Sequence, residues 1–324
     1  MTGDDSGKQI QRSVCIVSCS SESRPSESTV ALAATFQVSC RVSTLVLCDS
    51  DTFVENDCAI KVSKGTKLSK LKHLLGRTNS DLICICDPDI TIDNQNALKV
   101  LGYAVNALNA NNLVVAFGVV DGRDTGNLLS KVICIDKWIS HRILRRTLWR
   151  IGAGITIPGQ FVIFSTALLA AVDPCVDSYL EDLYLGWLAR SRGAQICRVP
   201  LVIGHEDPRL SWASLVTQRI RWMKGLFHLW GHLVCQPTAT FFLAVHFFAY
   251  HCLPILFVAS LFWLFFYMPL VAIPLLIGTV ITVSVFSNQN VQSASIFLTV
   301  FPIVHCIAIT TWWFPANREH LIRR

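Results

Sequence analysis

Between Lys224 and Arg318 the chain has no Asp, Glu, Lys or Arg residue. A soluble domain places charged side chains over its surface, so this absence excludes a wholly water-exposed C-terminal third. Hydrophobic residues make up 52% of the whole chain, and the excess lies after residue 225. The C-terminal part is therefore expected to lie in a membrane.

Several cofactor and metal motifs are also missing. The 13 cysteines form no Cys-x-x-Cys pair, and many lie in apolar runs such as 82–86, so neither a disulfide framework nor a zinc site is expected. Reduced cysteines fit a cytosol-facing domain. Lys64-Gly65-Thr66-Lys67 lacks the spacing of a P-loop, and Gly152-Ala153-Gly154 does not match a dinucleotide fingerprint. No basic stripe with interleaved aromatics accompanies the net charge of +6, so nucleic acid is not an expected partner.

Strand-like and helix-like segments alternate from Ser13 onward, after a polar lead-in over residues 1–12 that we expect to be disordered. That lead-in predicts neither a signal peptide nor an N-terminal span. The alternation predicts an α/β domain with a mainly parallel sheet. The expected strands are 14–17, 44–48, 81–86 and 113–117, and the expected helices are 27–39, 66–77 and 94–110.

Acidic residues follow two of the expected strands, as Asp49-Ser50-Asp51 and Asp87-Pro88-Asp89. Ligands of parallel sheets bind at the carboxyl ends of strands. Two carboxylates one residue apart can share a hard divalent cation that also contacts phosphate oxygens. The alternative for Asp87 and Asp89 is a turn with two solvated aspartates.

Two further motifs carry possible chemistry. Glu181-Asp182 precedes a plausible helix, where acidic residues are favoured as a simple cap, although one carboxylate would also suit a general base. Gln218, Arg221 and Trp222 form a Gln-x-x-Arg-Trp set. Arg221 would neutralise a leaving diphosphate and Trp222 would stack on a sugar ring; the alternative is an interfacial helix with ordinary Arg and Trp anchors.

Two basic amphipathic segments and three apolar segments describe the membrane region. Residues 128–150 are either an interfacial helix or a surface helix covering the sheet, and 211–233 repeat the pattern. The apolar segments, 239–264, 268–286 and 294–314, each approach the ~20 residues that a spanning helix needs. The three basic residues after the last segment favour two full spans over three by the positive-inside tendency, so the number stays open.

In order and spacing these motifs resemble membrane-bound family 2 glycosyltransferases, the group of the cellulose, chitin and hyaluronan synthases. The resemblance runs from about Ser13 to the apolar segments. It implies a GT-A domain over 13–235, transmembrane helices within 236–317 and a basic tail at 318–324. It also implies an integral membrane protein whose catalytic domain faces the cytosol.

The resemblance further implies an inverting, metal-dependent transfer of a sugar from a UDP-sugar to an acceptor hydroxyl. Asp182 would be the base, with Glu181 supporting it, and Asp87 and Asp89 would hold Mg²⁺ or Mn²⁺. Gln218 and Trp222, with the loop at Pro158-Gly159-Gln160-Phe161, would lie near the acceptor, and Glu206 and Pro208 also suit the family. The donor would contact the side chains of Asp49, Asp51, Lys64, Lys67, Asp87 and Arg221.

Some features depart from the family. Ser20-Ser21-Glu22 replaces its Asn-Glu pair, Ser165 replaces a frequent basic residue, and the N-terminal span of the large synthases is not seen. The acceptor is therefore left open between a growing polysaccharide, the primary expectation, and a lipid of the ceramide or polyprenol type. The alternative that is not an enzyme is a catalytically inactive membrane scaffold.

Overall fold

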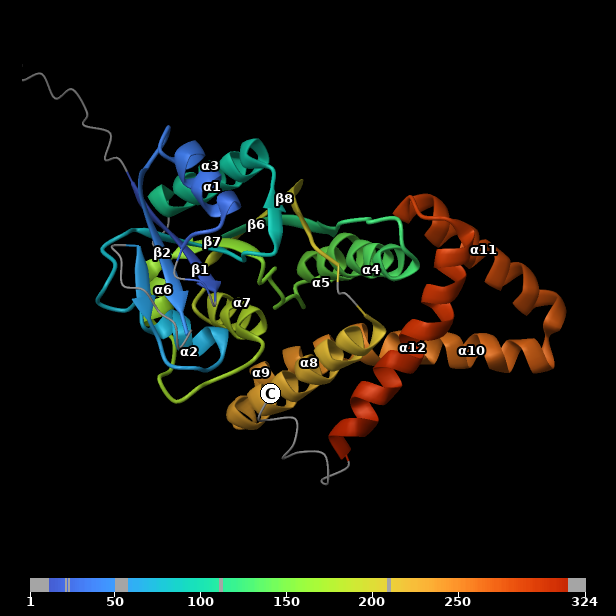
Figure 1. Ribbon diagram of the computed structural model, residues 1–324. Helices are drawn as coiled ribbons and strands as arrows, with labels where there is room; N and C mark the ends of the chain where they lie inside the picture. The colour runs from blue at the N-terminus through green and yellow to red at the C-terminus, as the bar shows by residue number, and fades with distance from the viewer. Residues whose placement is uncertain are drawn as a thin grey trace, which may run out of the picture.

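The structure, a computed structural model, describes residues 12–20, 22, 24–49, 58–110, 113–208 and 211–313. Within them one mixed sheet forms the N-terminal part, and long helices extend from one side of it (Figure 1). Along the sheet the strands are β3 (Ala59–Lys61), β2 (Arg41–Cys48), β1 (Ser13–Ser20), β4 (Leu82–Cys86), β7 (Phe161–Ser165), β6 (Val114–Gly122), β8 (Gln195–Glu206) and β5 (Ile90–Ile92).

The pairing of the strands is mostly parallel. β1 pairs in parallel with β2 and β4, β2 with β3, and β6 with β8. β7 runs antiparallel between β4 and β6, and β5 is antiparallel to β8. Every residue of β4 and β7 is buried and all but Ser165 are apolar, as expected of central strands covered on both faces. The expected α/β class with a mainly parallel sheet is confirmed.

Helices cover both faces of the sheet (Figure 1). Ile16 packs on the side of α1 (Glu27–Phe36) and α3 (Asn94–Ala110), while Val17 packs on the side of α2 (Lys67–Lys72), α6 (Thr166–Ala170) and α7 (Glu181–Ser191). Successive strand residues point to opposite faces, which fixes this division. α2 ends five residues earlier than expected, and the following turns include Gly76 at a φ of 76°, a conformation that ends helices.

The basic segment after residue 128 is one continuous helical stretch. It consists of α4 (Leu128–Trp138), a π-helical turn η1 (Ile139–Leu144) and α5 (Arg145–Arg150). Its apolar side chains Val132 and Ile135 are buried in a cluster with Leu215, Val283 and Phe297 from the C-terminal helices. The stretch therefore lies between the sheet and the C-terminal helices. It is neither only an interfacial helix nor only a surface helix that covers the sheet, the two interpretations that the sequence left open.

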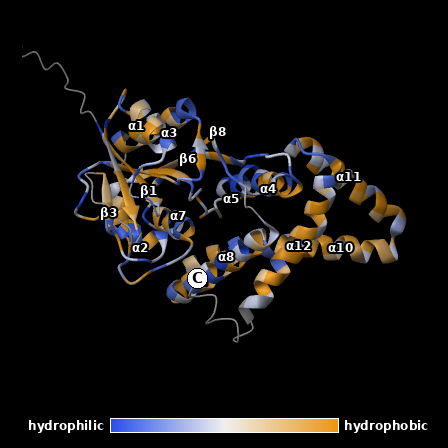
Figure 2. Ribbon diagram, in the orientation of Figure 1, coloured by the Kyte–Doolittle hydropathy of each residue, from blue (hydrophilic) through white to orange (hydrophobic). Residues whose placement is uncertain are grey.

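The C-terminal part is helical. It contains α8 (Trp212–Leu233), α9 (Pro237–Phe247), the π-helical turn η2 (Phe248–Cys252), α10 (Leu253–Tyr267), α11 (Pro269–Ser287) and α12 (Val291–Trp313). Three helical stretches within the described residues are long and apolar enough to cross a membrane: Pro237–Tyr267, Pro269–Ser287 and Val291–Thr311. They form the continuous hydrophobic arm in Figure 2, and large side chains such as Phe262 and Phe266 are 65% exposed on it. The basic tail 318–324 lies outside the described residues.

Candidate active site

An acidic pair stands at the carboxyl end of β4. The backbone N–H of Asp87 donates to the carbonyl oxygen of Gln160 at 2.9 Å, which ties the strand end to the loop before β7. The Asp87 side chain is half-buried and that of Asp89 is exposed. The buried apolar strand thus delivers two carboxylates to the edge of the sheet where ligands of α/β proteins bind.

Lys67 joins this acidic pair to the second acidic motif. Its Nζ lies 2.6 Å from Asp87 Oδ1 and 3.3 Å from Glu181 Oε1, and it donates to the carbonyl oxygen of Gly159 at 2.7 Å. Lys67 is the first residue of α2, whose N-cap is Thr66. Burial alone would lower the pKa of Lys67, but Asp87 and Glu181 outweigh it and raise that pKa. A permanently charged ammonium therefore holds the two motifs together.

The carboxyl of Asp87 has a strongly perturbed pKa. Burial raises it to about 6, against the opposing effect of the Lys67 ammonium. A group that is costly to ionise and faces an open strand end is typical of a functional site.

Glu181 and Asp182 begin α7, beside Gly159. The Leu183 N–H donates to Asp182 Oδ1 at 2.8 Å. Burial raises the pKa of both carboxyls; Lys67 opposes the shift at Glu181, and Arg145 opposes it at Asp182. A Cβ at Gly159 would lie 3.0 Å from Glu181 Oε1, so glycine allows the loop to approach this closely. Asp182 is thus a half-buried carboxylate with a raised pKa, which suits a general base.

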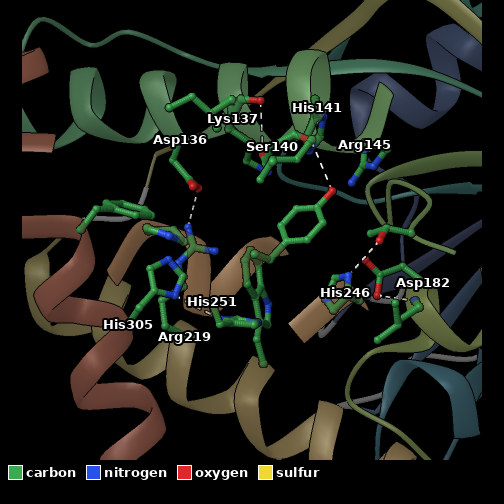
Figure 3. A pocket seen from close by; sticks show the side chains of 18 of the residues that line it. Asp136, Lys137, Ser140, His141, Arg145, Asp182, Arg219, His246, His251 and His305 are labelled. Atoms are coloured by element: carbon green, nitrogen blue, oxygen red, sulfur yellow. Dashed lines mark hydrogen bonds and ion pairs between the residues drawn. The ribbon is translucent and has the colours of Figure 1, made fainter. Parts of the chain in front are cut away.

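Asp182 lines a cavity of about 120 Å³ between the sheet domain and the C-terminal helices (Figure 3). The cavity also touches the π-helical turns η1 and η2, which lie against each other, and the Tyr250 hydroxyl of η2 donates to the Ser140 carbonyl of η1 at 3.4 Å. Arg145, Arg219 and His246 point into it (Figure 3). Single π-helical turns often occur at functional sites because they redirect side chains.

The Gln-x-x-Arg-Trp set is only partly at this cavity. Trp222 lines it, whereas Arg221 is exposed and Gln218 is half-buried, and neither is among the lining residues. Arg219 takes the place beside Trp222: it is 4% exposed, its Nη2 lies 2.5 Å from Asp136 Oδ2, and its guanidinium stacks 4.0 Å from the Trp222 ring. Residues 219 and 222 share a helix face because they are three positions apart.

The remaining donor candidates lie on the sheet edge around β2. Asp49 Oδ2 is 2.7 Å from Lys70 Nζ, one turn along α2 from Lys67. Lys64 is exposed just before α2. Asp51 lies outside the described residues.

The structure gives contacts to Glu206, which the resemblance named without a role, and adds polar residues that the sequence did not point to. Glu206 accepts from Gln160 Nε2 at 2.6 Å and from Lys137 Nζ at 2.5 Å, which ties the loop at 158–161 to α4 and β8. Three histidines line the cavity from the apolar helices: His246, hydrogen-bonded to Thr156, and the pair His251 and His305, whose Nδ1 atoms are 3.1 Å apart. Ionisable residues inside apolar helices are the signal that could have found them.

The donor set at β4 fits a hard divalent cation that is shared with a phosphate ligand. Asp87 and Asp89 supply carboxylate oxygens, the ligands that Mg²⁺ and Mn²⁺ prefer. Within the described part of the chain no three His, Cys, Asp or Glu side chains gather into a metal site of their own. A cation here would therefore need oxygen atoms from a second ligand, as from a diphosphate.

The fold is that of the GT-A glycosyltransferases, followed by helices able to cross a membrane. A mannosyltransferase from Pyrobaculum calidifontis, solved with GDP-mannose and Mn²⁺, matches 95% of this chain and 88% of its own, at 13% identity and a TM-score of 0.53. Glucosyl-3-phosphoglycerate synthase from Mycobacterium tuberculosis, solved with phosphoglyceric acid, matches 67% and 80%, at 16% identity and a TM-score of 0.45. No protein-family model matches the chain, and no curated protein matches its sequence.

Proposed function

We propose that this protein is a membrane-bound glycosyltransferase that moves a sugar, with inversion, from a nucleoside-diphosphate donor, UDP-linked, to an acceptor hydroxyl. The observation that carries the proposal is the link Asp87–Lys67–Glu181 at the edge of a GT-A sheet, with Asp182 facing a cavity. Lys67 thereby joins the proposed donor carboxylate Asp87 to Glu181, the residue next to the proposed base.

Asp87 and Asp89 would hold Mg²⁺ or Mn²⁺ against the donor. When bound, the cation supplies positive charge that stabilises the departing diphosphate. Lys67 keeps Asp87 in place, and Lys70 does the same for Asp49. Asp49, Asp51 and Lys64 would contact the nucleotide side of the donor, and Arg221 would reach its diphosphate from the exposed face of α8.

Asp182 would take the proton from the acceptor hydroxyl as that oxygen attacks the anomeric carbon. The carbon–oxygen bond to the diphosphate breaks on the opposite side, and the leaving group keeps the electron pair. Glu181 fixes this position through Lys67. Trp222 supplies a flat apolar wall of the cavity, on which an acceptor group can pack, and Gln218 would lie farther along α8.

Polysaccharide synthesis and a single transfer to a lipid remain the two acceptor hypotheses. The cavity walls favour a lipid acceptor, because Pro254, Phe297 and Phe301 from the membrane helices line it next to Asp182. A catalytic domain that faces the cytosol, where nucleotide sugars are made, completes the proposal.

A donor screen tests the function. Membranes containing the protein are given several UDP-sugars and GDP-mannose with Mg²⁺ or Mn²⁺, and nucleoside diphosphate release is followed. We expect release from one donor, abolished by EDTA and by Asp87→Ala. The length of the radiolabelled product then separates a polymer from a single transfer, and no release from any donor would support an inactive scaffold.

A further inference from the structure

Arg145 is a buried cation that faces the cavity. The charge of Asp182 and the Tyr250 hydroxyl act on it, but among the described residues no carboxylate forms an ion pair with it within 4 Å. Its side chain lines the cavity and only 6% of the residue is exposed. Neither its Nε nor its Nη1 has a hydrogen-bond partner. Buried guanidinium nitrogens without partners are costly, so their presence in a cavity indicates an anionic ligand.

The other charges around the cavity are already balanced. Lys137 Nζ lies 2.5 Å from Glu206 Oε2, and Arg219 Nη2 lies 2.5 Å from Asp136 Oδ2. Before the reaction the Asp182 carboxylate partly offsets the charge of Arg145. Once Asp182 has taken up the acceptor proton, Arg145 keeps one positive charge, which a ligand group with a single negative charge would balance.

A separate apolar groove lies next to the cavity along the membrane helices. Pro254 on α10 and Phe301 on α12 line the cavity, and Val258 and Leu298, one helical turn farther along, line the groove. α11 closes its other side. The groove is lined almost wholly by apolar side chains: Val258, Leu261, Phe262, Phe265, Ala272, Leu276, Val280 and Leu298, with Ser295 and Thr299.

We propose that the acceptor is a phosphodiester lipid, whose phosphate binds Arg145, whose headgroup hydroxyl faces Asp182 and whose hydrocarbon chain lies in the groove between α10, α11 and α12. The proposal rests on the proposed function and names its acceptor class. A phosphodiester has a single negative charge and oxygen atoms that can accept from the unpartnered Nε and Nη1 of Arg145. A guanidinium binds phosphate oxygens through several N–H groups at once. A ceramide, which has no charge, would leave Arg145 unpaired.

The atoms of the reaction balance with this acceptor. The headgroup oxygen forms a bond to the anomeric carbon, Asp182 receives the hydroxyl proton, and the donor diphosphate leaves with the electron pair of the broken bond. The lipid phosphate stays unchanged throughout and acts only as the group that Arg145 recognises.

Phosphatidylglycerol is the probe for binding, because its headgroup carries one phosphodiester and free hydroxyls. The full chain in neutral detergent is titrated with phosphatidylglycerol, with diacylglycerol of the same chains, and with the soluble glycerophosphoglycerol, and bound lipid is counted by native mass spectrometry. We expect phosphatidylglycerol to bind at least about tenfold more tightly than either of the others, the usual scale for a charged hydrogen bond. Equal binding of diacylglycerol overturns the anion site, and equal binding of glycerophosphoglycerol overturns the groove.

Substitutions localise the effect. Arg145→Gln should remove the preference for phosphatidylglycerol and Arg145→Lys should restore part of it, while the matched control Arg150→Gln, on the exposed side of α5, should leave it intact. Leu298→Trp should fill the groove and weaken phosphatidylglycerol but not glycerophosphoglycerol, a result that does not depend on how Arg145 variants fold. An unchanged preference in Arg145→Gln overturns the assignment.

Sugar-transfer assays test separately whether the protein is a glycosyltransferase and whether a phosphodiester lipid is its acceptor. Donor turnover by the wild-type protein tests the proposed function, and radiolabelled sugar on phosphatidylglycerol tests the acceptor. Turnover with bound but unlabelled phosphatidylglycerol would overturn the acceptor assignment and leave the glycosyltransferase standing. Absence of all turnover would overturn the proposed function itself.

Discussion

Asp182 is a carboxylate whose environment sets when it can accept a proton. Burial raises its pKa, and the Arg145 guanidinium works against that shift. A base acts only when it is deprotonated, so sugar transfer should be lost as the pH falls through the raised pKa of Asp182. The loss should therefore occur at a higher pH than for an ordinary aspartate, whose pKa is about 3.9. Removing Arg145 takes away the group that favours the ionised form, so the loss should begin at a still higher pH.

The pH profile of kcat checks this prediction in the wild type and in Arg145→Gln. Asp182→Asn should reduce kcat by at least about a thousandfold at every pH, on the scale expected for a lost general base. Donor affinity, measured by titration, should stay near its wild-type value. Near-normal transfer by Asp182→Asn would assign the base to another residue.

Lys67 neutralises two carboxylates that come from separate parts of the chain. Lys67→Met would leave Asp87 and Glu181 facing each other without a cation. The side chains of Lys67 and Asp87 are 16% and 23% exposed, so solvent softens the penalty. We expect Lys67→Met to lower the free energy of unfolding by about 2 kcal/mol, which is less than the loss that follows when one partner of a fully buried ion pair is removed.

Denaturant unfolding in detergent measures the effect of Lys67→Met. Lys99→Met, an exposed lysine on α3, is the control and should change stability by less than about 0.5 kcal/mol. The two variants lose the same chemical group, so an equal stability would mean that the ion pairs with Asp87 and Glu181 contribute nothing.

At the scale of elements, the position of α7 depends on one close approach. A Cβ at Gly186 would lie 1.9 Å from the carbonyl oxygen of Ile155. Gly186→Ala must therefore push α7, with Glu181 and Asp182 at its start, away from the neighbouring backbone. We expect a loss of about 3 kcal/mol, at the upper end for overpacking.

Gly102 on α3 is the matched comparison, because nothing lies within 4 Å of a Cβ built there. Gly102→Ala should stabilise the protein by about 0.5–1 kcal/mol through helix propensity alone. In thermal unfolding, the melting temperature should thus fall for Gly186→Ala and rise for Gly102→Ala. A shift of the same sign would contradict the packing of α7 described here.

The sequence predicted those elements whose signal is local. Alternation, caps and a buried apolar run predicted α3 and β4, and Asp87 followed because it comes directly after β4. The role of Arg219 was missed because the motif points to Arg221, whereas the phase of α8 decides which arginine is buried. The π-helical turns η1 and η2 carry no local signal in the sequence, and they lie against each other in the fold.

At the scale of the whole molecule, the cavity joins segments that no local pattern connects. Its walls come from η1, α7, α8, η2 and α12, and nothing in the sequence fixes how these meet. The uncharged stretch predicted the helices able to cross a membrane, while the contact between α4 and α12 turned an undecided amphipathic segment into the bridge between them.

The proposed orientation gives a labelling prediction. Cys175 is exposed on the sheet domain, whereas Cys306 is exposed on an apolar spanning helix, where lipid shields it from water. A membrane-impermeant maleimide should leave Cys175 unlabelled in intact cells and label it once the plasma membrane is permeabilised. Cys175→Ser provides the control for labelling at other positions, and labelling of Cys175 in intact cells would reverse the orientation.

The helical stretch Pro237–Tyr267 has 31 residues, so it is about 46 Å long, against about 30 Å of hydrocarbon in a typical bilayer. Its residues from His246 to Pro254 border the cavity, and α10, which begins at Leu253 and has 15 residues, extends only about 22 Å. The depth of the cavity relative to the lipid headgroups is then set by hydrophobic mismatch. For the proposed membrane-bound enzyme we therefore expect bilayer thickness to influence the reaction, because a thicker membrane would draw the mouth of the site toward the acyl chains and a thinner one would leave it in water.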